Sequence, residues 1–555
     1  MKRISQNPNF KKMIPWLLVG TLAAFMFFWD IGSYALLNNN EGMYAQIAKE
    51  MLYSGNYVIP TLNGLTYIEK PPLLYWMMAL SFKVFGVNEW GARFVPALFG
   101  FMTAMGVGLF AARRLGQKSG LYTTLILSTS LGFVLFFRTV FFDGVFTAWL
   151  TFALLCFFCW TENFTRRFLL GFYALMALAV MTKGLIALVL VGLVWVFYYT
   201  FVMRARTSFF APLDPLGILL FLGMAAPWHV MATLEKVDFA WFYFVNEHVL
   251  RFLGKRLPKD YYEGPFYYYL PRLLLYFLPW TLFFPKFVKE KFSRQDPFKF
   301  FFLCWFGVFF LFFSFSRAKA NYYLVTVMPA LAVLLAPLVT GDVGKNVAFF
   351  WGALVGVLMP LGVWLGLKGL IPFPPQAKDV ALFAGETFYL VWSLVGAVVA
   401  TLCFFYRDRI LGVRPLLLGG GMATLLVVAG TLMPAAEDQL SGKAMAEFLK
   451  AYDMPLYLYR DYEKISAFPF YWGKTVRIVA SKSQDLWHAM DKGEKPERFP
   501  SKTTFQLHGG LMVLHKDRLK KFCAAFPRAT HLGTKGCLSL YLVPPDQLLR
   551  ASKFS

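Results

Sequence analysis

The sequence predicts a mainly helical protein that crosses a membrane many times and ends in a small soluble α/β domain. Of its 555 residues 58% are hydrophobic and only 15% are charged, whereas about a quarter of the residues in soluble domains are charged. Apolar runs of spanning length recur from residue 14 to residue 432, and the composition then becomes polar. We therefore expect a transmembrane domain over residues 1–434 and a soluble domain over residues 435–555.

The first apolar run, Ile14 to Leu36, follows a basic N-terminal segment. The arrangement resembles a signal peptide, but no small-residue cleavage site follows and the run is long enough to span a bilayer. We interpret it as an uncleaved first transmembrane helix. Further runs bring the predicted number of spans to about thirteen: Ala92–Ala111, Leu121–Phe137, Val145–Trp160, Phe168–Met181, Leu185–Val202, Leu216–Ala232, Tyr268–Phe287, Phe300–Phe315, Tyr323–Thr340, Val347–Leu367, Thr387–Phe405 and Leu416–Leu432.

The positive charges predict the orientation of these spans. If the run Leu73–Val87 lies in the plane of the membrane instead of crossing it, the Lys- and Arg-rich short loops all fall on the cytoplasmic side, as the positive-inside rule requires. The C-terminal domain then lies outside the cytoplasm. The formal net charge of +24 is explained in the same way, so we exclude nucleic acid as a partner.

The stretch after the first span predicts two short helices at the membrane surface. Asn40 is expected to cap a helix over residues 40–55 that ends at Gly55, with an apolar face and a polar face. Pro71 and Pro72 are expected to open a second helix over residues 71–87. An amphipathic helix of this kind favours an in-plane position at the bilayer surface.

Charged residues on the outer side of the predicted spans suggest a binding site. Cations on the translocated side oppose the usual bias, so several of them together indicate an anionic ligand with an apolar part, such as a phosphate on a lipid chain. Asp143 begins a span, and a lone carboxylate there is a functional candidate. The other candidates are Glu41, Lys70, Arg138, Lys183, Glu247, His248, Arg251, Arg272, Arg317 and Lys319, with a basic cluster over Lys255–Lys259 and with Tyr322 and Tyr323 shortly after Lys319.

The cysteines and histidines identify no cofactor with certainty. Cys523 and Cys537 are expected to be able to pair if the C-terminal domain lies outside the cytoplasm. Glu247 and His248 alone are a weak metal signature. The sequence therefore assigns no metal ligands and leaves a requirement for a divalent metal open.

An ordered set of motifs then resembles a known family. NEGMYAQIAKEML, GNYVIPTLNGLTYIEKPPLLYW, FGVNEWGAR, FFDGVFTAW, MTKG, NEHVLRF and SRAKANYYLVTVMPAL follow one another along the chain. In this order they resemble the bacterial lipid A aminoarabinose transferases and their relatives, the protein O-mannosyltransferases, which are glycosyltransferases of the GT-C type. The resemblance covers roughly residues 14–435, and in the C-terminal domain only YRDYEKISAFPFYW resembles the family. It implies about thirteen spans, two juxtamembrane helices and a periplasmic C-terminal domain.

The resemblance also implies a donor and roles for individual residues. The family uses a sugar carried on undecaprenyl phosphate, whose phosphate Lys70 and Arg251 would hold, with His248 beside them. Asp143 would be an active-site carboxylate, Tyr44 and Tyr67 would line the pocket, and Tyr323 would cap it. Relatives commonly carry an aspartate and an arginine where this chain has Asn40 and Met43. Any role as a base at the first motif would therefore pass to Glu41 or be absent.

The expected function is transfer of a sugar from undecaprenyl phosphate to an envelope acceptor, with lipid A or lipopolysaccharide as the first expectation. The reaction would take place at the periplasmic face of a bacterial inner membrane. A protein acceptor, as in mannosyl transfer, is the alternative. A lipid or sugar transporter is the alternative of another class, although it predicts charged sites near the middle of the membrane. The sequence identifies neither the sugar nor the base.

Overall fold

The computed structural model describes residues 8–259, 263–339, 357–370, 413–452 and 454–546. The chain forms two compact units. The first consists of Met1–Ile31, Arg93–Val230 and Phe244–Leu432, and the second consists of Gly32–Ala92, Met231–Tyr243 and Met433–Ser555. The second unit thus joins the stretch after the first apolar run to the C-terminal part of the chain.

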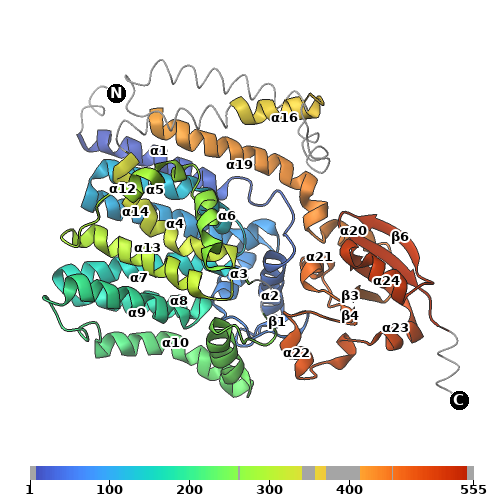
Figure 1. The fold of residues 1–555 in the computed structure, drawn as a ribbon. Helices are drawn as coiled ribbons and strands as arrows, with labels where there is room; N and C mark the ends of the chain where they lie inside the picture. The colour runs from blue at the N-terminus through green and yellow to red at the C-terminus, as the bar shows by residue number, and fades with distance from the viewer. Residues whose placement is uncertain (1–7, 260–262, 340–356, 371–412, 453, 547–555) are drawn as a thin grey trace. The chain divides into compact units, whose positions relative to one another are not determined.

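The first unit is a bundle of apolar helices. Neighbouring helices in this unit pack along their length, as α7 does with α8 and α13 does with α14 and α9 (Figure 1). Its helices are α1 (Pro8–Phe28), α4 (Glu89–Leu115, whose first residues belong to the second unit), α5 (Gln117–Thr129), α6 (Leu131–Arg138), α7 (Phe142–Asn163), α8 (Arg166–Lys183), α9 (Ile186–Tyr198), η2 (Tyr199–Met203), α10 (Pro215–Glu235, whose last residues belong to the second unit), η3 (Trp241–Leu250, whose first residues belong to the second unit), η4 (Phe266–Tyr268), α11 (Tyr269–Tyr276), η5 (Trp280–Phe283), α12 (Phe284–Lys289), α13 (Pro297–Phe315), η6 (Asn321–Val327), α14 (Met328–Val339), α16 (Met359–Leu367) and α19 (Val413–Leu440, whose last residues belong to the second unit).

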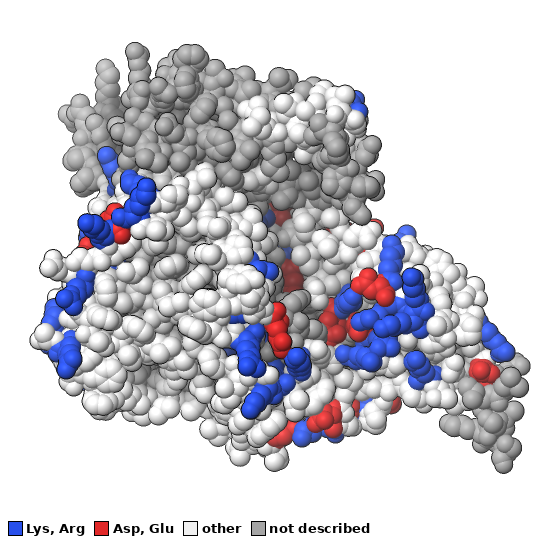
Figure 2. All heavy atoms as spheres, in the orientation of Figure 1, with Lys and Arg blue, Asp and Glu red and all other residues white. Residues whose placement is uncertain are grey.

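The prediction of a multi-pass membrane protein is confirmed. Among the described residues six helices are long and apolar enough to cross a membrane, and there are seven if the bent pair α5 and α6 counts as one span. The predicted span Thr387–Phe405 lies outside the described residues, as does the first part of Val347–Leu367, up to residue 356. In Figure 2 the visible face of the helical unit is largely uncharged, with Lys and Arg gathered toward its edges. Such a distribution is typical of a surface that faces lipid.

Three predicted spans are not continuous helices over their whole length. The run Ile14–Leu36 is helical only as far as Phe28, where α1 ends. The run Leu121–Phe137 bends by 60° between α5 and α6, because Ser130 adopts an extended backbone conformation there. The run Tyr268–Phe287 is divided into η4, α11, η5 and α12. Pro279 lies inside this run, and a proline can neither donate the helical hydrogen bond nor fit against the preceding turn.

The two predicted juxtamembrane helices are present in the second unit as α2 (Asn40–Ser54) and α3 (Leu73–Phe85), with a short hairpin of β1 (Thr61–Leu62) and β2 (Leu65–Thr66) between them. Gly55 ends α2 in the left-handed conformation, as predicted. The prediction that Asn40 caps α2 is wrong. Asn39 precedes the helix with φ 68° and makes no capping hydrogen bond through its side chain.

The predicted division of α2 into an apolar and a polar face is also wrong. Every residue from Glu41 to Ala48 is buried. The helix packs against α3, and it also packs against α21 of the C-terminal part of the same unit. The polar side of α2 therefore faces protein within this unit, which the local sequence pattern does not reveal.

The C-terminal residues form the predicted α/β domain around a five-stranded sheet of order β4-β3-β5-β7-β6. β3 runs parallel to β4 and β5, while β7 is antiparallel to both β5 and β6. The apolar side chains of β5 and its neighbours bury Tyr459, Met512 and Phe522 in one core. The elements are α20 (Lys443–Leu449), β3 (Leu456–Tyr459), η8 (Glu463–Ile465), α21 (Phe468–Trp472), β4 (Arg477–Val479), α22 (Trp487–Asp491), η9 (Pro496–Arg498), α23 (Lys502–His508), β5 (Gly510–His515), η10 (Lys516–Arg518), α24 (Leu519–Ala525), β6 (Thr530–Lys535) and β7 (Leu538–Val543).

The expected pairing of Cys523 with Cys537 is not formed. Both residues are free cysteines, and their side chains occupy different environments. Cys523 is exposed on α24, whereas Cys537 is buried at the turn between β6 and β7. A bond between them would require one of the two to leave its environment.

Replacement of Gly42 tests the close packing of α2. A Cβ atom at residue 42 would lie 2.4 Å from the Ala467 Cα atom, so Gly42→Ala should destabilise the protein by about 1–3 kcal/mol through overpacking. Thermal unfolding in detergent measures the change. Gly192→Ala on α9 is the matched control, because a Cβ there meets no atom within 4 Å. Equal melting temperatures for the two variants would contradict this packing.

Candidate functional site

Asp143 and Lys183 form an ion pair in the first unit. Asp143 lies in the first turn of α7, as predicted, and its residue is only 3% exposed. Lys183 is the last residue of α8, and its Nζ donates to Asp143 Oδ1. A buried charge is strongly unfavourable without a partner, so each of these two side chains requires the other. The sequence analysis named Lys183 among the outer charges, and MTKG among its motifs, but it gave Lys183 neither a partner nor a role.

Tyr323 joins this pair through its ring. The Lys183 ammonium lies 4.3 Å from the centroid of the Tyr323 ring and 5.3 Å from that of Phe146. A cation over an aromatic face is attracted by the ring quadrupole, most strongly where water is excluded. The structure thus brings Asp143 and Tyr323 together, and the residue that joins them is Lys183.

His248 holds the turn that follows Lys183. Its Nε2 accepts a hydrogen bond from the Leu185 backbone N–H at 3.1 Å. A ring nitrogen that accepts a hydrogen bond carries no proton, so in this geometry His248 is neutral, with its proton on Nδ1. His248 therefore positions the segment between α8 and α9 that begins next to Lys183.

Glu247 is the centre of a second group of charges, on the π-helix η3. Its carboxylate contacts Arg251 Nη1 at 3.1 Å and Arg256 Nε at 2.6 Å. Glu247 and Arg256 are buried, while a quarter of the Arg251 side chain remains exposed. The predicted pair of Glu247 and Arg251 is therefore present. Arg256 belongs to the basic cluster over Lys255–Lys259 that the sequence analysis named, but its pairing with Glu247 was not predicted. Its signal was weak, because Arg256 is one of several basic residues after η3.

Asn246 fixes the segment that supplies Arg256. Its side-chain amide donates to the Leu257 carbonyl at 2.7 Å and accepts from the Leu257 N–H at 2.8 Å. The backbone after η3 is thereby folded back on the helix. π-Helices are rare and are frequently found at functional sites. Asn246, Glu247 and His248 all lie on η3, which agrees with this tendency.

Lys319 has a structural role in the structure. It is 3% exposed, and its Nζ donates to the carbonyls of Phe313 and Ser314 at 3.0 and 2.7 Å. These carbonyls belong to the last turn of α13, where a cation is favoured by the helix dipole. Its neighbour Arg317 is exposed, and with Arg256 and Lys259 it lines a small basic cleft.

The remaining predicted site residues lie in the second unit. Glu41 is buried, and its Oε2 accepts from the Leu37 N–H at 2.9 Å. The Tyr44 ring packs against that of Tyr75 at 6.2 Å. Asn40, the residue in place of the family aspartate, is partly exposed at the start of α2.

Tyr67 and Lys70 lie on either side of Glu69. The Tyr67 hydroxyl donates to Glu69 Oε2 at 3.4 Å, and Lys70 Nζ donates to the Glu69 carbonyl at 3.3 Å. Burial of Tyr67, together with the negative charge of Glu69, raises the pKa of its phenol well above the ordinary value. Tyr67 therefore stays protonated and acts as a hydrogen-bond donor.

The C-terminal domain contributes a carboxylate, Asp485, to the group of site residues in the second unit. Burial, followed by the charges of Glu69 and Asp485, raises the pKa of Tyr75 well above its ordinary value. Asp485 precedes α22 and is far from Tyr75 in the sequence. Sequence reasoning missed both residues, because no local pattern connects them. The predicted site residues thus form two groups, one in each unit.

The charged groups contain no evident metal centre. Within the described ranges, no three His, Cys, Asp or Glu side chains are arranged to hold a metal ion.

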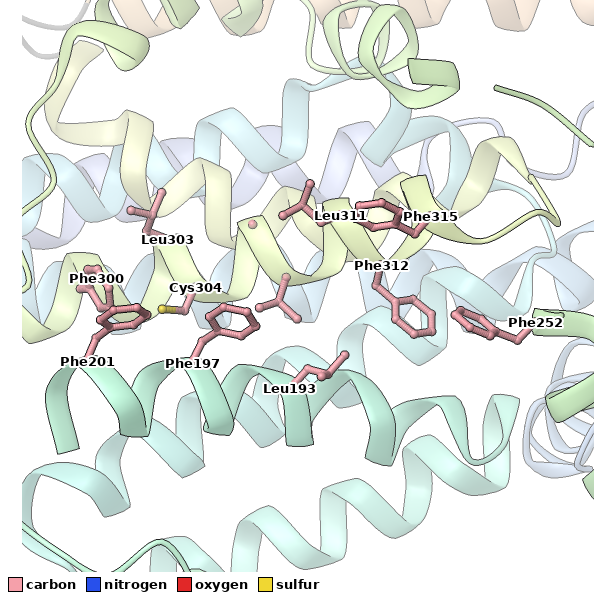
Figure 3. Close-up of a pocket in the computed structure, with 12 residues that line it drawn as sticks. Leu193, Phe197, Phe201, Phe252, Phe300, Leu303, Cys304, Leu311, Phe312 and Phe315 are labelled. Atoms are coloured by element: carbon pink, nitrogen blue, oxygen red, sulfur yellow. The ribbon is translucent and has the colours of Figure 1, made fainter. Parts of the chain in front are cut away.

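An apolar groove lies in the first unit, with a volume of about 480 Å³. It runs between α13 and the helix formed by α9 and η2, and Phe252 lies at one end (Figure 3). Phe252 directly follows Arg251 in the chain. The side chains that line the groove are Leu193, Phe197, Phe201, Phe252, Phe300, Leu303, Cys304, Val308, Leu311, Phe312 and Phe315.

Known proteins are similar to this chain in sequence and in fold. Residues 69–231 match the family model described as dolichyl-phosphate-mannose-protein mannosyltransferase. An uncharacterised protein of Aquifex aeolicus is 34% identical over 377 residues, which cover 65% of this chain and 72% of the relative. The undecaprenyl phosphate-alpha-4-amino-4-deoxy-L-arabinose arabinosyl transferase of Edwardsiella ictaluri is 29% identical over 407 residues, covering 70% of this chain and 72% of the relative.

A solved structure extends the likeness to the fold of almost the whole chain. The crystal structure of ArnT from Cupriavidus metallidurans bound to undecaprenyl phosphate matches with a TM-score of 0.79 and 22% identity, covering 96% of this chain and 98% of the other. These similarities exclude the transporter alternative. The chain belongs to the membrane-embedded glycosyltransferases of the GT-C type that include the bacterial aminoarabinose transferases.

Proposed function

We propose that the protein transfers a sugar, of the aminoarabinose type, from undecaprenyl phosphate to lipid A at the periplasmic face of the inner membrane. The observation that carries the proposal is Arg251, a partly exposed cation that directly follows the π-helix η3 and contacts the buried Glu247. The names of the relatives supply the donor and the sugar class. A protein acceptor is the second candidate, because the matching family model describes protein mannosyltransferases.

The apolar groove suits the lipid chain of the donor. It is lined entirely by hydrophobic residues and glycine. Phe252, which lies at one end of the groove, directly follows Arg251 in the chain. A polyprenyl chain in this groove would bring its phosphate to the end where Arg251 lies. Burial of a long hydrocarbon chain supplies binding free energy in proportion to its area.

Arg251 and Lys70 act on the phosphate in this proposal. The phosphate is the leaving group, so negative charge develops on it as the bond to the sugar breaks. Cations held in place before the reaction stabilise that charge without reorganisation. A direct attack by the acceptor displaces the phosphate with inversion at the sugar carbon.

The carboxylates have separate roles. Asp143 faces Lys183 and Tyr323, so it is placed to orient the sugar or to accept a proton from a hydroxyl acceptor. Glu41 is bonded to the backbone at Leu37 and is the second candidate base. Tyr44 and Tyr67 line the donor pocket, and His248 holds its place beside Lys183. A lipid phosphate as acceptor would already be ionised and would need no base.

Replacement of the two cations tests the phosphate assignment. Arg251→Ala and Lys70→Ala should each lower kcat by about 10²–10³-fold, because each removes a charge from the developing phosphate. Lys70→Arg should fail as well, since a planar guanidinium does not replace a compact ammonium. Transfer from a purified undecaprenyl phosphate-linked sugar in detergent measures the effect.

The matched controls are Arg167→Ala and Lys83→Ala, which remove exposed cations on α8 and α3. Both control variants should keep near-normal turnover. Turnover within threefold of the parent enzyme in either Arg251→Ala or Lys70→Ala would refute the role of that residue.

A second set of variants separates the two carboxylates. If Asp143 is the base, Asp143→Asn should lower the rate by about 10²–10⁴-fold. This variant also leaves Lys183 buried without its partner, which should cost about 3–5 kcal/mol of stability. The double variant Asp143→Asn, Lys183→Gln should recover the stability and remain inactive.

Glu41→Gln is the comparison, because a glutamine oxygen can still accept the Leu37 N–H. We expect it to be less damaging than Asp143→Asn. A fully active Asp143→Asn beside an inactive Glu41→Gln would reverse the assignment and make Glu41 the base.

A fusion tests the proposed orientation. Alkaline phosphatase attached after Ser555 should be active in cells. This reporter is active only in the periplasm, and the basic loops predict that the C-terminal domain lies there. A β-galactosidase fusion at the same residue should be inactive. The opposite pair of activities would overturn the orientation and the periplasmic active site.

A further inference from the structure

The start of η3 is anchored to the C-terminal domain within the second unit. Asp238 lies just before η3, and its Oδ2 accepts from His488 Nε2 at 2.8 Å, with Lys492 Nζ at 3.5 Å from the same oxygen. Burial alone would raise the pKa of Asp238, but the hydrogen bond and charge of His488 together lower it below the ordinary value. Asp238 is therefore ionised near neutral pH and bonded to α22.

Aromatic rings reinforce this contact. Phe242, in the first turn of η3, is 2% exposed and lies 4.6 Å from the His488 ring and 6.4 Å from the Trp487 ring. Phe239 stacks on Tyr243 at 5.2 Å. The beginning of η3 is thus held by an ionic hydrogen bond and by a buried aromatic contact, both to neighbouring residues of α22.

The segment before α22 is itself held by the motif YRDYEKISAFPFYW, the part of the C-terminal domain that resembles the family. Glu463 of this motif accepts hydrogen bonds from the Ser483 hydroxyl at 2.6 Å and from the backbone N–H groups of Gln484 and Asp485 at 2.6 and 3.1 Å. The proposed reaction assigns no role to this motif. Its position indicates that it fixes α22, which carries His488.

His488 also leaves one nitrogen unsatisfied. Its residue is 8% exposed, and Nδ1 has no hydrogen-bond partner among the described residues. Buried polar atoms without partners are uncommon and require an explanation. Apolar side chains alone would be sufficient to pack α22 against η3. The presence of a buried histidine at this contact therefore suggests that its hydrogen bond to Asp238 is required.

We propose that His488 is a positioning residue for sugar transfer, which acts by fixing the start of η3 through Asp238 and Phe242. η3 is one helix, and Glu247, His248 and Arg251 follow within and just after it. A displaced start changes where these residues lie. The inference rests on the proposed function, because it assigns its effect to Arg251 and the donor phosphate.

The test uses the full-length protein in lipid nanodiscs, with two measurements. His488→Ala should increase amide hydrogen exchange in peptides covering residues 241–252, because the anchored helix then opens more often. It should also weaken binding of undecaprenyl phosphate by about tenfold, the effect expected for a lost hydrogen bond to a charged group. His488→Gln should restore both values, since its amide can donate to Asp238.

The matched control is His508→Ala, which removes an exposed histidine from α23 of the same domain and should change neither measurement. Asp238→Ala should reproduce His488→Ala, and the double variant should be no worse than either single variant, because both remove the same contact. Additive losses would contradict a shared contact.

The results separate this inference from the proposed function. Exchange in residues 241–252 that is unchanged by His488→Ala would overturn the inference. Faster exchange with unchanged binding of undecaprenyl phosphate and unchanged transfer would overturn it as well, leaving a structural contact only. If the parent protein itself does not bind undecaprenyl phosphate, the proposed donor is wrong, and with it the effect that we assign to His488.

Discussion

The ion pair between Asp143 and Lys183 is the interaction on which the first unit depends most. Inside an apolar bundle an isolated charge is prohibitively unfavourable, and an ion pair is tolerated only with good geometry and further contacts. Asp143 fixes the start of α7 and Lys183 fixes the end of α8. Tyr323 covers the ammonium, and His248 binds the backbone two residues further on. One pair of charges thereby sets the relative positions of four segments that are far apart in the sequence.

The same constraint explains, without a ligand, other cations that the sequence places on the predicted outer side. Arg138 donates to the carbonyls of Met26 and Trp29, and Arg93 donates to that of Ile31. These carbonyls lie at or just beyond the end of α1, where the backbone has no helical donors left. Lys319 does the same for α13. The excess of positive charge on the side predicted to be translocated, which the sequence alone attributes to an anionic ligand, is therefore partly a means of completing helix ends.

The sequence predicts what depends on neighbours in the chain. Pro71 and Pro72 before α3, Gly55 after α2 and Asp143 at the start of α7 follow from local rules, and the structure has all of them. The burial of α2 could not be predicted, because its polar side packs against residues more than 400 positions away, such as Ala467.

The candidate site was predictable to the same extent. The sequence analysis selected residues in short motifs as site candidates, but it did not predict which residues they pair with. Lys183 lies 40 residues from Asp143, and Arg256 lies beyond the turn after η3. Asp485 lies in the same unit as Tyr75 but in the C-terminal part of the chain, far from Tyr75 in the sequence. Single-sequence patterns report which residues are unusual in their surroundings, but charge pairing across a bundle depends on the three-dimensional fold.

The two groups of charges in the first unit differ in a way that separates their roles. Asp143 and Lys183 neutralise each other, so their pair has no net charge with which to attract an anion. Glu247 contacts both Arg251 and Arg256, and one carboxylate against two guanidinium groups leaves a net charge of one positive unit. Because Arg251 is the partly exposed member, this excess charge is accessible to a phosphate. The neutral pair of Asp143 and Lys183 beside Tyr323 instead suits the orientation of a sugar or the transfer of a proton. In the proposed reaction, proton transfer requires a carboxylate that does not also hold the cations of the leaving phosphate.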